Sequence, residues 1–118
     1  MTLDRRTLLL AGLAATAAAP AQGHHGWGSY DSSQALTLVG NIVKAAYENP
    51  HGEFALRTPE KVWTVTLAPP FRMQSRGLLK EMLVPGKAAI VVGYPSKADP
   101  NEMRAERITI DGKTIEQR

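Results

Sequence analysis

The sequence contains no cysteine. This absence excludes a disulfide framework, thiolate metal sites and cysteine nucleophiles. A small domain without such crosslinks depends on its apolar core for stability, helped by a metal ion or a partner where one binds.

The chain also has little excess charge of either sign. Its formal net charge is +3, and it falls to about +2 if a leader that carries Asp4, Arg5 and Arg6 is removed. A charge this small gives no reason to expect a nucleic acid or an anionic membrane as a partner. No nucleic-acid partner is therefore predicted.

No apolar run is long enough to span a membrane. The Leu-rich and then Ala-rich run near the N-terminus, Leu8 to Ala19, has twelve residues, whereas a span needs about 20. Arg5 and Arg6 precede this stretch and small residues follow it, which is typical of a signal peptide. The adjacent arginines also resemble a twin-arginine signal. We predict an export signal over residues 1–23, a periplasmic or secreted protein, and membrane contact only during export.

Two cleavage positions fit the rule of small residues before the cut. Cleavage after Ala21 releases a chain that begins Gln22-Gly23-His24, and cleavage after Gly23 releases one that begins His24-His25. What remains, about 95 residues over 24–118, is enough for one domain but not for two.

The mature part has more β-strand signals than helical ones. Alternating or β-branched runs predict five strands, at 36–44, 53–57, 62–67, 88–94 and 103–110, with an edge strand at 113–116. Gly40 marks an expected bulge in the first strand, and the alternation slips between Ala105 and Ile108. The one helical candidate is Ser75 to Leu83. Three strands, a short helix and two strands is the order of a small, mainly β, OB-fold-like Greek-key barrel.

The three histidines of the chain fall in two short motifs. His24-His25-Gly26-Trp27 stands where the export signal ends, and Asn49-Pro50-His51-Gly52 interrupts the strand pattern. Pro50 restricts its own backbone and that of Asn49, so His51 is expected to project from a defined turn. We predict that the two motifs meet and that His24, His25 and His51 bind a metal ion. The alternative is that the histidine pair is solvated and His51 only hydrogen-bonds its turn.

These motifs also carry a family resemblance. The mature chain resembles a family of small exported bacterial proteins of unknown function, DUF6152, in its His-His motif with a following Asp31, in Asn49-Pro50-His51, in the strand that contains Trp63, and in Pro85-Gly86. It departs from the family pattern in having Gly26-Trp27 where Ser-Phe is usual. The resemblance implies export and a small β-barrel, and it implies no reaction.

The choice of metal depends on the cleavage site. A chain that begins at His24 offers its α-amine and imidazole together, and His51 then completes a three-nitrogen set suited to copper(II). A chain that begins at Gln22 offers amine, amide and imidazole nitrogens in a square plane, which also suits copper(II). Three histidines plus water would instead form a zinc site. Copper is therefore expected ahead of zinc, and no motif for an organic cofactor is present.

Other residues are expected around these ligands. A carboxylate, Asp31 or Glu48, would orient a histidine by accepting its second ring N–H, and Asn49 belongs to the same turn as His51. Trp27 and Tyr30 are candidates for an aromatic binding face.

The primary functional hypothesis is an exported metal-binding protein. The alternative is a metal-free module of the cell envelope that binds a ligand or another envelope protein. The third possibility is a copper or zinc enzyme. No catalytic motif favours that interpretation, so no catalytic residue is assigned.

Overall fold

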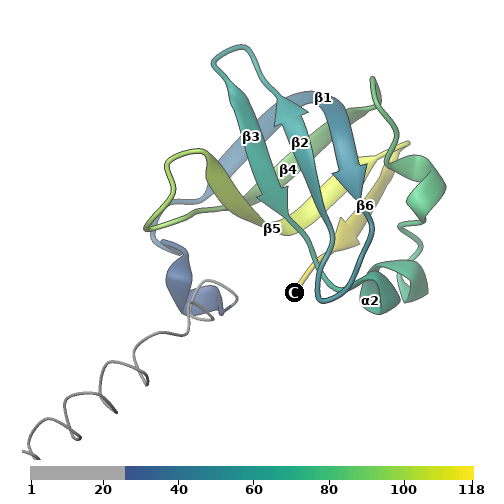
Figure 1. Cartoon of the computed structure of the whole chain (residues 1–118), viewed down its shortest axis with the longest axis horizontal. Coiled ribbons are helices and arrows are strands. Elements are labelled where there is room, and N and C mark those ends of the chain that lie inside the picture. The colour runs from purple at the N-terminus through teal and green to yellow at the C-terminus, as the bar shows by residue number, and fades with distance from the viewer. Residues whose placement is uncertain (1–25) are drawn as a thin grey trace, which may run out of the picture.

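The structure, a computed structural model, describes residues 26–118. The predicted signal segment, His24 and His25 lie outside the described residues. In chain order, the elements are η2 (Trp27–Ser29), β1 (Leu36–Ala46), β2 (Glu53–Arg57), β3 (Val62–Thr66), α2 (Pro70–Ser75), η3 (Lys80–Met82), β4 (Ala88–Pro95), β5 (Glu102–Ile110) and β6 (Lys113–Glu116). Figure 1 shows the strands wrapped around one another, with α2 beside the lower end of the sheet.

Five strands close into a barrel. Their order is β3-β2-β1-β4-β5, and a parallel pairing of β3 with β5 joins the two ends. The helical segment lies between β3 and β4, as in the predicted OB-like topology, and β6 extends the sheet beyond β5. Closure pairs most of the exposed strand edges. The predicted fold is therefore confirmed.

The core is built from alternate residues of the strands, as the pleat requires. Phe54 and Leu56 of β2 are buried, while Glu53 and Arg57 on either side of them are exposed. In β5 the buried positions shift from odd-numbered to even-numbered residues between Ala105 and Ile108. The cause is one extra residue, Glu106, because Ala105 pairs with Gly93 while Arg107 pairs with the adjacent Val92. The predicted slip between Ala105 and Ile108 is thus a β-bulge.

The bulge in β1 does not lie at Gly40, where the sequence predicted it. The register shifts between Ile42 and Lys44 instead. Gly40 has a different role, because a Cβ placed there would overlap the carbonyl oxygen of Arg57 and approach Leu56. The glycine allows β1 and the end of β2 to approach closely.

The predicted helix over Ser75–Leu83 was wrong. The helix begins earlier, at Pro70, which suits the first helical position because a proline there loses no hydrogen bond. It ends before Gly77, whose φ of +92° is left-handed. Leu78 and Leu83 are still buried, but they are contributed by an irregular segment, so their helix-like spacing misplaced the element. No helix within residues 26–118 is long and apolar enough to cross a bilayer.

The apolar run of β4 is a strand, although only every second residue is buried. Ala89 and Val91 face the core, whereas Ile90 is 41% exposed and pairs with the exposed Val39 of β1. The run was predicted as a buried strand, and its outer face instead meets solvent. The predicted turn at Asp111-Gly112 is confirmed, since both residues have positive φ and connect β5 to β6.

We expect Gly40→Ala to destabilise the barrel by about 2 kcal/mol or more, because the new Cβ would force apart two backbones that cannot shift independently. Gly28→Ala is the matched control, since no heavy atom lies within 4 Å of a Cβ at that position. Urea unfolding of both variants measures the difference. Equal stabilities would contradict the close approach of β1 and β2.

Candidate functional site

His51 stands in the loop between β1 and β2 and is partly buried. Its Nδ1 lies 3.0 Å from the carbonyl oxygen of Gly52. That oxygen also accepts the Leu67 amide at 2.8 Å, and the Gly52 amide donates to the Ala68 carbonyl at 3.0 Å. Because a carbonyl can only accept, Nδ1 carries the hydrogen in this bond, and in the neutral ring the lone pair is then on Nε2. The His51 ring is thus oriented by backbone that β3 holds in place.

Gly52 leaves little room beside His51. A Cβ on Gly52 would come within 2.8 Å of the Met73 side chain and 3.2 Å of the Ala46 carbonyl. The loop therefore lies tightly against the barrel. The predicted turn at Asn49–Gly52 is a bend between two strands, and its Asn49–Pro50 peptide bond is cis.

The first described residues of the other motif are fixed to the loop between β4 and β5. The carbonyl of Ser29 accepts the Lys97 amide at 3.0 Å, and the Asp31 amide donates to the Pro95 carbonyl at 2.9 Å. Tyr30 forms a β-bridge with Ser96. Residues 29–31 therefore add a short stretch of backbone pairing to the barrel.

Trp27 is held by cations. The guanidinium carbons of Arg104 and Arg118 lie 4.1 and 4.0 Å from the centre of its ring. Tyr94 meets the ring edge-on, with centroids 6.3 Å apart. Each cation–π contact contributes about 0.5–2 kcal/mol, depending on how far it is desolvated. The ring thus packs against the barrel, and the predicted place of Trp27 on an aromatic binding face stays a prediction.

Tyr30 lies deeper than its predicted place on a binding face, since only 3% of its surface is exposed. Its hydroxyl donates to Glu102 Oε2 at 2.6 Å, and Thr66 Oγ1 donates to the same oxygen at 2.8 Å. Burial, and then the hydrogen bond to Glu102, raises the pKa of Tyr30 to about 12. Tyr30 therefore anchors the N-terminal segment in the barrel.

A chain of contacts connects the two histidine motifs through the C-terminal residues. Arg118 contacts Trp27, and the neighbouring Gln117 accepts the Ala68 amide at 2.9 Å through its side chain. Ala68 in turn pairs with Gly52, next to His51. Figure 1 shows η2, the C-terminus and the loop between β1 and β2 at the lower end of the barrel. The segment that follows His24-His25 thus docks at the end that carries His51.

Among the candidates expected around the ligands, Asp31 has hydrogen-bond partners close to it in the chain. The Asp31 carboxylate accepts the Ser33 amide and hydroxyl and the Gln34 side chain, at 2.6 to 3.1 Å. These hydrogen bonds lower the pKa of Asp31. Glu48 and Asn49 lie in the loop before His51. No histidine is among the hydrogen-bond partners of Asp31 within residues 26–118.

His24 and His25, the other two predicted ligands, lie outside the described residues. Within residues 26–118, no group of three histidine or carboxylate residues is arranged to hold a metal ion. A site that contains His51 therefore needs donors from residues 1–25, as the sequence predicted, or from a partner.

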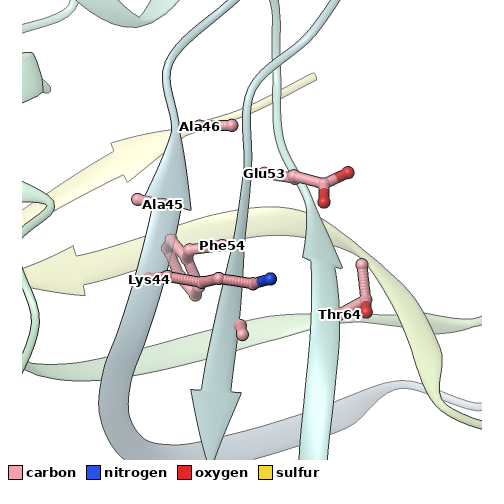
Figure 2. A pocket seen from close by; sticks show the side chains of 7 residues that line it. Lys44, Ala45, Ala46, Glu53, Phe54 and Thr64 are labelled. Carbon is pink, nitrogen blue, oxygen red and sulfur yellow. The ribbon is translucent and has the colours of Figure 1, made fainter.

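A shallow hollow of about 300 Å³ lies on the face of β1, β2 and β3, near the His51 loop but without a histidine in its lining. Figure 2 shows Lys44, Glu53 and Thr64 around it. The hollow offers one ammonium, one carboxylate and one hydroxyl group. It suits a small polar ligand rather than a transition metal.

Sequence reasoning missed the residues that hold the N-terminal segment. Arg104, Arg118 and Tyr94 contact Trp27, and Glu102 accepts Tyr30. Their separation along the chain, 72 positions between Tyr30 and Glu102, gives no local pattern. The one available signal was the alternation of β5, which places Glu102 and Arg104 on the opposite face of the strand from the buried Met103.

We predict that Tyr30 adds stability that is lost at high pH. Its folded pKa is about 12, above the value of 10.0 for a free tyrosine, so the folded state binds the proton more tightly. This contribution, on the order of 2 kcal/mol, is complete below pH 10 and disappears as the pH rises through 12. Urea unfolding at several pH values between about 9 and 12 measures this effect, and the free energy of unfolding should decrease less in Tyr30→Phe than in the native protein. Parallel profiles would contradict this assignment.

Comparisons with known proteins agree with this fold. The barrel is similar to a crystal structure of TiaS in complex with a tRNA and ATP, with a TM-score of 0.51 and 18% sequence identity over 69% of this chain and 19% of that chain. It is also similar to a crystal structure of a ZRD-deleted mutant of TiaS with agmatine, with a TM-score of 0.52 and 20% sequence identity over 75% of this chain and 25% of that chain. This chain thus matches a quarter or less of those proteins, and at such identities the likeness shows the fold alone. No curated protein matches the chain. A model described as a family of unknown function, DUF6152, matches residues 12–103. The chain therefore belongs to the DUF6152 family.

Proposed function

We propose that this chain is an exported protein of the cell envelope that binds one metal ion through His24, His25 and His51. The observation that carries the proposal is the docking of residues 27–30 at the end of the barrel where His51 stands. A ligand pair just before Trp27 would therefore begin at the same end of the barrel as His51.

Chain reach supports this arrangement. One residue spans at most about 3.6 Å, so His24 and His25 remain within roughly 10 Å of Trp27, even when fully extended. Trp27 is held at the barrel end by Arg104 and Arg118. This anchoring restricts the volume that the two histidines can search, which favours a site shared with His51.

The ring orientation of His51 supports a ligand role as well. A metal-binding histidine usually donates its second ring N–H to a carbonyl or a carboxylate, which fixes the tautomer and the ring. His51 has this arrangement through Nδ1 and the Gly52 carbonyl. Nε2 is therefore the proposed donor atom.

Copper is proposed ahead of zinc. The proposed donors are imidazole nitrogens, together with the terminal amine if cleavage exposes it, and such donors bind copper(II) more tightly than zinc(II). With three imidazoles and no amine, an open zinc site is the alternative.

A metal-free binding module is the second proposal, and the hollow in Figure 2 favours it. Lys44, Glu53 and Thr64 offer both charge signs and a hydroxyl to a small polar ligand. Such binding would not depend on the histidines, which separates the two proposals experimentally.

The metal proposal is tested by titrating the exported, processed protein with copper(II) and zinc(II). We expect one equivalent to bind, and we expect His51→Ala to weaken binding at least about tenfold through loss of one nitrogen ligand. His24→Ala combined with His25→Ala should weaken it further. The mass of the processed protein identifies its first residue and therefore the donor set.

The matched control is Lys44→Ala, which changes an exposed residue of β1 near the same loop without removing an imidazole. Its affinity should stay within about threefold of the native value, a margin of less than about 1 kcal/mol. Metal binding that is equally tight in the variant lacking all three histidines would overturn the proposal.

A further inference from the structure

Two rows of cross-strand partners form the floor of the hollow on β1, β2 and β3. In one row, Ala55 of β2 lies between Lys44 of β1 and Thr64 of β3. In the next row, Glu53 of β2 pairs with Ala46 of β1. Ala55 and Glu53 are two residues apart in one strand, so their side chains project from the same face of the sheet. All five residues line the hollow, and its charged and hydroxyl groups therefore surround a small side chain, that of Ala55.

The two charged groups of the hollow have opposite signs but do not form an ion pair. Lys44 and Glu53 are diagonal neighbours across β1 and β2, a position in which side chains project about 7–8 Å apart. The ion pairs within residues 26–118 join other side chains, and none includes Lys44 or Glu53. Figure 2 shows the Lys44 side chain extending across β2, toward the side on which Glu53 and Thr64 lie. The hollow therefore presents a cation and a carboxylate that do not neutralise each other by contact.

The charged residues of β5 that pair with β3 contact the N-terminal segment instead. Glu102 accepts the Tyr30 hydroxyl, and Arg104 stacks on the Trp27 ring. Neither residue is part of the lining of the hollow. A molecule in the hollow thus meets one positive and one negative side chain.

The size and the apolar lining of the hollow restrict what it can hold. Its volume of about 300 Å³ corresponds to roughly ten water molecules, and so to a ligand of about ten non-hydrogen atoms. Besides the charged and hydroxyl groups, the lining consists of Ala45, Ala46, Phe54 and Ala55. These side chains suit a short aliphatic body.

We propose that the hollow binds a small zwitterion with an aliphatic body, of the chemical class of the free α-amino acids. The ligand carboxylate lies over Ala55 and accepts hydrogen bonds from the Lys44 ammonium and the Thr64 hydroxyl. The ligand ammonium contacts Glu53, one row away on the same face. This inference rests on the second proposed function, the metal-free binding module, and names its class of ligand.

The charge pattern of the hollow sets its specificity. A ligand that carries only a carboxylate gains Lys44 but meets the negative charge of Glu53. A ligand that carries only an ammonium group gains Glu53 but meets the positive charge of Lys44. Since specificity is a difference between affinities, these repulsions favour a ligand that carries both charges.

Three probes of similar size test this pattern: L-leucine, isocaproate, which lacks the ammonium group, and isopentylamine, which lacks the carboxylate. Each is titrated into the full chain at constant ionic strength and without metal, so that the proposed metal site makes no contribution. The amide NMR signals of Ala55 and Thr64 report binding. We expect saturable shifts with L-leucine, and dissociation constants about fivefold or more higher for both singly charged analogues.

Glu53→Gln separates an electrostatic role from a structural one. It should weaken L-leucine binding about fivefold or more, yet strengthen isocaproate binding, because it removes the repulsion of the carboxylate. Ala55→Val should weaken the binding of all three probes. Its larger side chain fills the floor of the hollow on the outer face of β2, and a β-branched residue suits a strand.

Lys44→Gln should weaken L-leucine and isocaproate, and Lys113→Gln is its matched control. The control removes one positive charge from an exposed residue of β6 outside the hollow, so all affinities should stay as in the native protein. An equal loss of L-leucine affinity in Lys113→Gln would overturn the inference, because it would reduce the effect to overall charge.

Two further outcomes are distinct. Isocaproate or isopentylamine that binds as tightly as L-leucine would overturn the zwitterion assignment while leaving a metal-free binding module in place. No saturable shift with any of the three probes would overturn the inference and also remove the support that the hollow gives to such a module.

Discussion

The parallel pairing of β3 with β5 is the constraint on which the rest of this structure depends. It aligns Thr66 with Arg104 and Thr64 with Glu102. Glu102 then receives the hydroxyls of Thr66 and Tyr30, and Arg104 lies over Trp27. Closing the barrel and docking the N-terminal segment are therefore parts of one arrangement. Without the closure, neither anchor of that segment would have its partner.

The same closure positions His51. The end of β3 continues into Leu67 and Ala68, which hydrogen-bond Gly52 on both its carbonyl and its amide. The loop that carries His51 is thus held by backbone, independently of its own exposed residues. Because the C-terminal Gln117 also bonds Ala68, the loop, the C-terminus and η2 share one end of the barrel. This shared end is the physical basis of the proposed metal site.

Strand positions were predictable from the sequence because alternation reports burial directly. The pattern around Phe54 and Leu56 indicated β2, and the slip between Ala105 and Ile108 indicated the bulge in β5. The helix was misplaced because Leu78 and Leu83 are buried without being helical. Local periodicity shows which residues are buried, but it does not show which backbone conformation buries them. For the site, His51 was predicted from its motif, but the partners of Trp27 and Tyr30 come from strands and termini far along the chain. Only closure of the barrel brings those partners together, so they require the three-dimensional fold.

The most direct test of the central claim is a long-range ¹H–¹⁵N correlation spectrum of the histidine rings in the processed protein, recorded as copper(II) is added. We predict that the His51 signals broaden together with those of His24 or His25 below one equivalent. In the metal-free protein, we expect Nδ1 of His51 to carry the hydrogen. Broadening of the N-terminal histidines alone, with His51 unchanged at one full equivalent, would contradict a shared site.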